Sequence, residues 1–150
     1  MNLSQRLDQD LKEAMRNRDA LRRDSIRMAR AAIHNEEIAQ GQQLSDEGIL
    51  DVLTRQAKRH RESIDMFTQA NRTDLVSREE AELKVLRDYL PQQLSEIELR
   101  QFIEQAIKEV SAEGPRDIGK VMKELVPKIK GRADGKAASA VVQEILASNS

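Results

Sequence analysis

The sequence predicts an all-α protein in two parts: an N-terminal helical domain of long helices over residues 1–92, then a small C-terminal three-helix bundle over residues 93–150. Charged residues make up 34% of the chain and aromatic residues 2%, so Leu, Ile, Val, Ala and Met carry the apolar content. This mixture is typical of helices with solvated outer faces and is poor in the residues that strands prefer. Apolar residues also recur at helical spacing along nearly the whole chain.

Two helices are expected in residues 1–40. Asp19 is a suitable N-cap for the second, which ends near Gln40-Gly41. The apolar stripes are Leu3, Leu7, Leu11 and Ala14 in the first helix and Leu21, Met28, Ala29, Ala32 and Ile33 in the second. A single long helix through residues 17–19 is the alternative, and the sequence leaves that choice open.

Two further helices complete the N-terminal part. Ser45 is a suitable N-cap for the third helix, and Asn71 is a suitable left-handed terminator for it. Thr73 is expected to cap the fourth helix, which Pro91 follows closely. The inward positions are Ile49, Leu50, Leu53, Ala57, Ile64 and Phe67 in the third helix and Leu83, Leu86 and Leu90 in the fourth.

The C-terminal part begins after Pro91-Gln92-Gln93, which is the best candidate for a domain boundary. Ser95 and Glu98 match a capping box at the start of a helix that should continue to Gly114-Pro115. The apolar stripe of this helix is Leu99, Phe102, Ile103, Ala106, Ile107 and Val110.

Two short helices should complete the bundle, with Asp117 and Asp134 as their N-caps. Pro127 removes a backbone donor and should kink or finish the first of them. Their stripes are Ile118, Val121, Met122, Leu125 and Val126, and then Ala138, Val141, Val142, Ile145 and Leu146. Three such helices can cover one another's apolar faces.

Composition excludes several classes of protein. The chain has no cysteine, which rules out disulfides, thiolate catalysis and zinc–thiolate sites. No apolar run approaches the roughly 20 residues that span a bilayer. The start of the chain holds Asp8, Asp10 and Glu13 and has no apolar segment of the kind found in secretory signals. We therefore expect a cytoplasmic protein without a membrane partner.

A basic segment at residues 115–136 departs most from the rest of the chain. It contains seven basic and three acidic residues, whereas the whole protein has a net charge of −1. Such a segment, interrupted by glycines, favours contact with a polyanion. The residues proposed for this contact are Lys120, Lys123, Lys128, Lys130, Gly131, Arg132, Gly135 and Lys136. The alternative makes Gly131 a helix terminator, Asp134 an ordinary cap and the lysines a solvated surface.

No motif indicates catalysis or a cofactor. The chain has no phosphate-binding loop, no dinucleotide fingerprint and no nucleophile elbow, so we assign no catalytic residue. His34 and His60 are the only histidines, and no spacing in the sequence suggests a metal site; His60 is expected to be packed. Arginines between residues 16 and 30 interleave with Asp19 and Asp24, which is typical of ion pairs on helix surfaces.

Several motifs in order resemble the YqeY-like family over essentially the whole chain. They are Leu11-Lys12-Glu13-Ala14-Met15, Arg61-Glu62-Ser63-Ile64, Asp88 to Ser95, Gly119-Lys120-Val121-Met122 and Lys130 to Lys136. Two positions depart from the family's pattern: Asn71 stands where a glycine is usual, and His60 stands where an arginine is common.

The family is similar in architecture to the tail of the B subunit of tRNA-dependent amidotransferases (GatB), a helical appendage that engages folded tRNA. The resemblance implies that Lys130, Gly131 and Arg132, with Lys120 nearby, face RNA. It implies association with a glutamine-dependent carbon–nitrogen ligase, but not the ligase's catalytic domains.

We therefore expect a non-catalytic protein that binds tRNA or another structured RNA, or an amidotransferase accessory, with no cofactor and no DNA partner. The few aromatic residues leave little base stacking, so contacts should be to phosphates and folded shape. Two alternatives remain: a helical protein–protein adaptor without RNA binding, and a component of an amidotransferase assembly that is active only within it.

Overall fold

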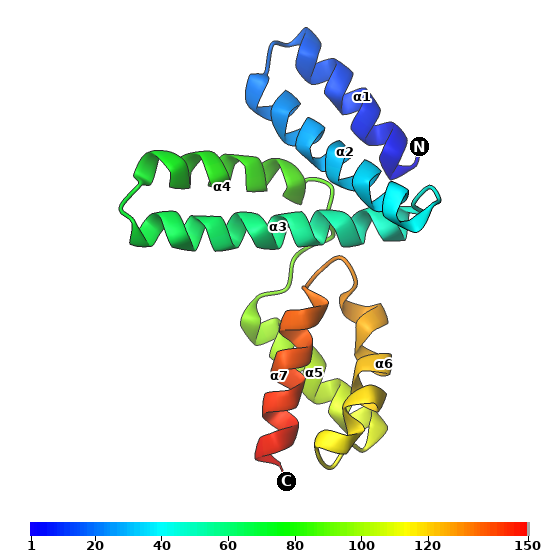
Figure 1. Cartoon of the computed structure of the whole chain (residues 1–150). Coiled ribbons are helices and arrows are strands. Elements are labelled where there is room, and N and C mark those ends of the chain that lie inside the picture. Colours follow the sequence, from blue (N-terminus) through cyan, green and yellow to red (C-terminus); the bar gives the residue numbers. More distant parts are fainter. Residues whose placement is uncertain (150) are drawn as a thin grey trace. The chain divides into compact units, whose positions relative to one another are not determined.

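The computed structural model describes residues 1–149, which form seven α-helices and one short 3₁₀ turn and contain no strand (Figure 1). The all-α class is confirmed. The chain divides into two compact units, Met1–Pro91 and Gln92–Ser150, called here the N-terminal unit and the C-terminal unit. The helices are α1 (Leu3–Arg16), α2 (Ala20–Gln40), α3 (Asp46–Gln69), α4 (Thr73–Arg87), α5 (Glu96–Val110), α6 (Ile118–Ile129) and α7 (Gly135–Ser148), with the 3₁₀ turn η1 at Pro115–Asp117.

The first two helices are separate, which settles the choice that the sequence left open. Arg18 adopts a left-handed conformation (φ 53°) between them, and the Asp19 carboxylate accepts the backbone N–H of Arg22 at 3.1 Å. This conformation breaks the helical hydrogen-bond ladder, and the cap starts a new one. The expected ends at Gly41 (φ 71°) and Asn71 (φ 57°) are also confirmed as left-handed residues.

The core of the N-terminal unit lies among all four of its helices. α2 faces this core with a different stripe from the expected one. Leu21 and Met28 are 39% and 49% exposed, whereas Ser25 and Ile26 are buried beside the correctly predicted Ala29 and Ile33. The hydroxyl of Ser25 is satisfied within the helix, where it donates to the carbonyl of Leu21 at 2.8 Å. This local bond removes the cost of burying the serine.

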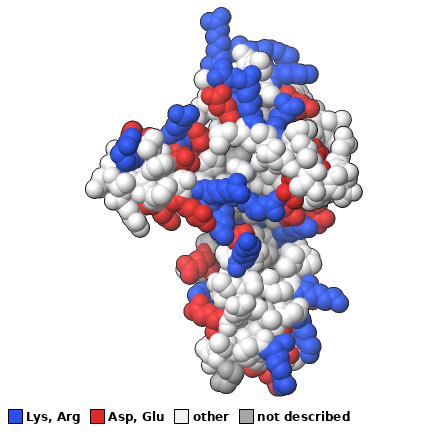
Figure 2. All heavy atoms as spheres, in the orientation of Figure 1, with Lys and Arg blue, Asp and Glu red and all other residues white. Residues whose placement is uncertain are grey.

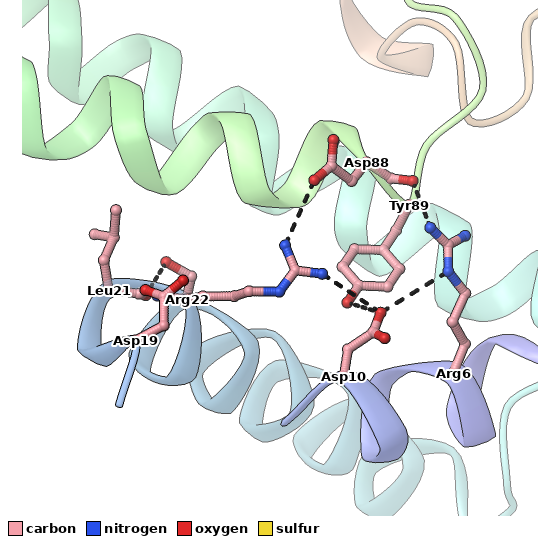
Figure 3. A network of polar contacts seen from close by, with 8 residues as sticks. Arg6, Asp10, Asp19, Leu21, Arg22, Asp88 and Tyr89 are labelled. Atoms are coloured by element: carbon pink, nitrogen blue, oxygen red, sulfur yellow. Dashed lines mark hydrogen bonds and ion pairs between the residues drawn. The ribbon is translucent and has the colours of Figure 1, made fainter. Parts of the chain in front are cut away.

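A polar network fastens the end of α4 to α1 and α2 (Figure 3). The hydroxyl of Tyr89 donates to the carboxylate of Asp10 at 2.5 Å, and Arg22 bridges Asp10 and Asp88 at 3.6 Å each. Arg6 donates to the carbonyl of Asp88 at 2.9 Å, and its guanidinium lies 4.6 Å from the centre of the Tyr89 ring. Burial, and then the Asp10 carboxylate, raise the pKa of Tyr89 well above its usual range.

The start of α4 differs slightly from the prediction. Arg72 rather than Thr73 occupies the N-cap position, and no side chain caps this end of the helix. Leu83, Leu86 and Leu90 are buried as expected.

The C-terminal unit contains three helices packed around one apolar core. Ser95 and Glu98 form the predicted capping box, with each side chain accepting the other residue's backbone N–H at 3.1 Å. α5 ends at Val110 with Ser111 left-handed (φ 54°), several residues before the expected stop at Gly114-Pro115. The buried centre of the unit is Leu99, Ile103, Ala106, Val121, Leu125, Ile129, Ala138, Val142 and Leu146.

Two details of α6 correct the sequence interpretation. Asp117 stands at the N-cap position, but its carboxylate accepts the N–H of Glu113 at 2.9 Å rather than an N–H of α6. Pro127 does not finish the helix, which continues to Ile129. In residues 1–149 no helix is both long enough and apolar enough to cross a membrane.

Candidate nucleic-acid interface

The basic segment of residues 115–136 runs from η1 through α6 and the following turn into the start of α7. It therefore lies entirely within the C-terminal unit. The apolar side chains of α6 at Val121, Leu125 and Ile129 are buried. Because helical neighbours on one face are three or four residues apart, this buried stripe divides the remaining surface of α6 into two flanks.

One flank carries Lys128, whose charge is already matched. Its ammonium lies 2.8 Å from the carboxylate of Glu109 on α5 and 3.1 Å from that of Glu124. Glu109, and next Glu124, raise the pKa of Lys128, and the ammonium in turn holds the pKa of Glu109 down at about 2. An ion pair of this kind must be broken before Lys128 can meet a phosphate, so Lys128 is a weaker candidate for RNA contact than the sequence suggests.

Arg132 has a structural task in the turn after α6. Its Nε donates to the carbonyl of Gln92 at 3.0 Å, and its guanidinium lies 5.5 Å from the centre of the Phe102 ring. The carbonyl of Arg132 accepts the N–H of Leu94 at 2.9 Å. These contacts hold the first residues of the C-terminal unit against the α6–α7 turn.

Gly131 and Gly135 occupy positions that are explained by the backbone structure. Gly131 is buried and left-handed (φ 75°), and its carbonyl accepts the side-chain amide of Gln93 at 2.7 Å. Gly135 is the first residue of α7, where the Asp134 carboxylate accepts the N–H of Ala137 at 3.0 Å. This cap occupies one of the donors that an anion at the helix start would need. In both cases the geometry matches the structural alternative of a helix terminator and an ordinary cap.

Four lysines remain as candidates for phosphate contact: Lys120, Lys123, Lys130 and Lys136. Lys120 and Lys123 are exposed and lie at i and i+3 on the face of α6 that points away from its buried stripe. Lys130 caps the end of α6 and is half-buried, and Lys136 is exposed in the first turn of α7. Lys120 also lies 3.8 Å from Asp117, an exposed contact of small energetic weight.

The basic side chains do not merge into one continuous patch on the face drawn in Figure 2. Blue Lys and Arg atoms stand among red acidic atoms and white surface in both units. In the N-terminal unit two arginines of α2 form ion pairs of the kind that the sequence suggests: Arg23 lies 2.9 Å from Asp24, and Arg30 lies 2.9 Å from Asp8.

Sequence spacing missed one cluster of possible metal ligands. His60 on α3 lies beside Glu79 and Glu82 on α4, and the candidate ligand atoms of the three all lie within 4.8 Å of one another. His60 is packed, as predicted, with 8% of its surface exposed. No spacing in the sequence pointed to this cluster, because His60 and Glu79 are 19 residues apart and lie on two different helices.

The fold defines a class: an all-helical protein in two units, with a small C-terminal three-helix bundle that carries several exposed lysines. The family described as Yqey-like protein matches residues 4–146. The chain belongs to the YqeY-like family, as its motifs indicated.

Three fungal relatives share the printed name "Altered inheritance of mitochondria protein 41, mitochondrial". The chain is 33% identical over 144 residues to the one from Pyrenophora tritici-repentis, and the match covers 94% of this chain and 79% of the relative. Identity is 36% over 112 residues to that of Lachancea thermotolerans, covering 73% and 60%. It is 30% over 122 residues to that of Saccharomyces cerevisiae, covering 77% and 66%.

These relatives overturn one expectation. All three are named as mitochondrial proteins, which contradicts the cytoplasmic location expected from the sequence. That expectation rested on the composition of the first residues and not on the folded units. For two of the three relatives the chain spans less than two thirds of their length.

Proposed function

We propose that this YqeY-like protein binds structured RNA, with tRNA as the first candidate, and performs no chemistry on its own. The observation that supports this most is the set of lysines in the C-terminal unit: Lys120 and Lys123 are exposed neighbours on α6, and Lys130 and Lys136 follow at the end of α6 and the start of α7. Ammonium groups on flexible stems suit phosphate oxygens, whose contacts position a protein without reading sequence.

The composition of the chain supports the same mode of binding. Of the three aromatic residues, Tyr89 is buried, Phe67 on α3 is half-buried, and Phe102 packs against the core of the C-terminal unit. Stacking on unpaired bases is therefore a minor contribution, and the protein would follow the backbone of a folded RNA. We further propose that such binding serves a tRNA-dependent amidotransferase as an accessory, in keeping with the similarity to the GatB tail.

Substitution of the paired lysines tests RNA binding. Lys120→Glu with Lys123→Glu should weaken tRNA binding at least tenfold in a fluorescence anisotropy titration, while circular dichroism stays unchanged because both side chains are exposed. Lys12→Glu with Lys84→Glu is the matched control, since it changes net charge equally but alters exposed lysines of the N-terminal unit. Equal loss in both double variants, or no loss in the first, contradicts the proposal.

Arg132 is unsuitable for this test, although the resemblance places it on the RNA side. Arg132→Glu would remove the bond to the Gln92 carbonyl and place an acid near Phe102. A loss of binding would then report on stability as much as on phosphate contact.

The accessory role requires its own experiment. The full chain should co-purify with a glutaminase-containing assembly, and amide formation on charged tRNA by that assembly should fall when the chain is removed. If the chain co-purifies with the assembly but its removal does not change amide formation, the accessory role is contradicted. The proposal of RNA binding is not affected by that result.

A groove in the N-terminal unit favours a second candidate function, that of a protein adaptor. It has a volume of about 600 Å³ and lies between α2 and α3, and its lining is mixed: apolar Met28, Ala31, Ala32 and Val52, and polar Asn35, Glu36, Arg55, Gln56 and Arg59. An amphipathic helix with small apolar anchors and polar flanks suits such a groove. The adaptor function predicts a protein partner that the chain still captures after nuclease treatment and at high salt. Met28→Glu should abolish this capture. Met66→Glu, which changes another exposed methionine, is the control and should leave it intact.

A further inference from the structure

The cluster of His60, Glu79 and Glu82 joins α3 and α4, which pack extensively against each other in the N-terminal unit. The Nδ1 atom of His60 lies 2.5 Å from Oε2 of Glu79 and 3.8 Å from Oε2 of Glu82. Glu79 and Glu82 are at i and i+3 on α4, a spacing that brings both carboxylates to the same side of that helix. One imidazole nitrogen therefore faces two carboxylate oxygens.

The surroundings make this cluster different from an exposed group of acids. The side chains of His60 and Glu82 are each 9% exposed, and that of Glu79 is 22% exposed. Arg78 binds the other oxygen of Glu82, with its Nε 3.1 Å from Oε1, which leaves Oε2 facing the histidine. Two carboxylates held close together with little water repel each other, so a positive charge between them stabilises the arrangement.

We propose that His60, Glu79 and Glu82 form a binding site for a divalent first-row transition metal ion, with Zn²⁺ as its best representative. Imidazole nitrogen and carboxylate oxygen are ligands that such ions accept, and Zn²⁺ lies high in the order of affinities for nitrogen and oxygen sites. Three protein ligands leave a fourth position for water, and the partial exposure of Glu79 provides an approach from solvent.

The distances fit such an ion after a small adjustment. Ligands about 2.0–2.1 Å from a tetrahedral zinc ion are roughly 3.3 Å apart. His60 and Glu82 are close to that separation, whereas the Nδ1 atom of His60 and Oε2 of Glu79 would move apart by under about 1 Å. Glu79 is the most exposed of the three and can rotate without disturbing the core. Arg78 would remain in place as a second contact that orients Glu82.

The competing explanation is that the cluster is only a hydrogen-bonded ion pair between protonated His60 and the two glutamates. The two explanations differ in what an arginine at position 60 would do. His60→Arg keeps a positive charge next to both carboxylates, which preserves an ion pair, but it removes the metal ligand because guanidinium has no free lone pair.

The test uses the full chain, stripped with a chelator and titrated with ZnCl₂ in a calorimeter. We expect one tight site per chain and a rise in melting temperature on binding, because an ion that binds only the folded state stabilises it. His60→Arg and Glu82→Gln should each weaken that site at least tenfold, with folding checked by circular dichroism.

His34→Gln is the matched control, because His34 is the other histidine and is exposed on α2. It should bind Zn²⁺ like the wild type. A lack of saturable binding, equal binding by His60→Arg, or loss of the site in His34→Gln would each overturn the proposal, the last by showing a surface site. The cluster is an ion pair only if two results are found together: zinc has no effect on the wild type, and the zinc-free His60→Arg variant is as stable as the wild type.

Discussion

Glu109 connects α5 to α6 through the ammonium of Lys128, 2.8 Å away, and through this contact removes one lysine from the proposed RNA surface. The carboxyl group also accepts the side-chain amide of Gln105 at 3.2 Å. The hydrogen bond from Lys128 is the main reason that the pKa of Glu109 falls from 4.5 to about 2. Charge counting along the sequence could not reveal this pairing, since its partners are 19 residues apart.

A pH dependence follows from the sign of that shift. Because the pKa of Glu109 is lower in the folded state, ionised Glu109 stabilises the fold above about pH 4.5, and its contribution is lost as the pH falls towards 2. Glu109→Gln should therefore reduce stability at pH 6 slightly and flatten its decline between pH 5 and pH 2.5 in urea titrations. Glu104→Gln, an exposed change on the same helix, serves as the control. If the free energy of unfolding of Glu109→Gln declines as steeply with falling pH as that of the wild type, the ion pair of Glu109 is not the source of the pH dependence.

Tyr89 provides a second prediction at this scale. Tyr89→Phe removes the hydroxyl that donates to Asp10 while leaving the ring in place, and it should lower the free energy of unfolding by about 2 kcal/mol. In a double-mutant cycle with Asp10→Asn, the two losses should be less than additive, because both changes break the same bond. Fully additive losses measured by urea unfolding would show that the hydroxyl and the carboxylate do not interact.

At the scale of the elements, the helix ends show what the sequence could and could not predict. Ser45, Asp19 and the Ser95–Glu98 pair are local signals, and each was confirmed at its expected position. The end of α5 was misplaced because Gly114-Pro115 is a strong stop signal, whereas the chain turns left-handed earlier, at Ser111. A serine gives no warning of that conformation, which its β-carbon disfavours.

The strain at Ser111 is testable. Ser111→Gly should raise the free energy of unfolding by about 0.5 kcal/mol, because glycine adopts a positive φ without a steric cost. Ser139→Gly, inside α7 of the same unit, should instead lower it by a similar amount. Destabilisation by both changes would show that Ser111 is not strained.

The candidate sites were harder to predict than the helices, because they depend on contacts between helices that are distant in the sequence. All eight residues assigned to RNA contact lie on the C-terminal unit, but the structure gives Arg132 and Gly131 roles in the turn and pairs Lys128 with acids. The His60 cluster was missed for the same reason, because it exists only once α3 and α4 pack together. Patterns within one helix are readable from the sequence, but partners across helices are not.

At the scale of the whole molecule, the proposed binding should depend on salt in a limited way. If the four lysines each neutralise one phosphate, the logarithm of the tRNA association constant should fall with the logarithm of salt concentration with a slope of about −3. The Lys120→Glu, Lys123→Glu variant should have a slope smaller by about 2. Affinity that is independent of salt would exclude phosphate contact as the main source of binding.

The most direct test of the central claim is a footprint of tRNA on the isotopically labelled full chain, measured by NMR chemical-shift changes at low salt. The proposal predicts that the shifted amides concentrate between Lys120 and Lys136 and that the N-terminal unit changes little. Shifts centred on the arginines of α1 and α2, or a spectrum unaffected by saturating tRNA, would contradict it.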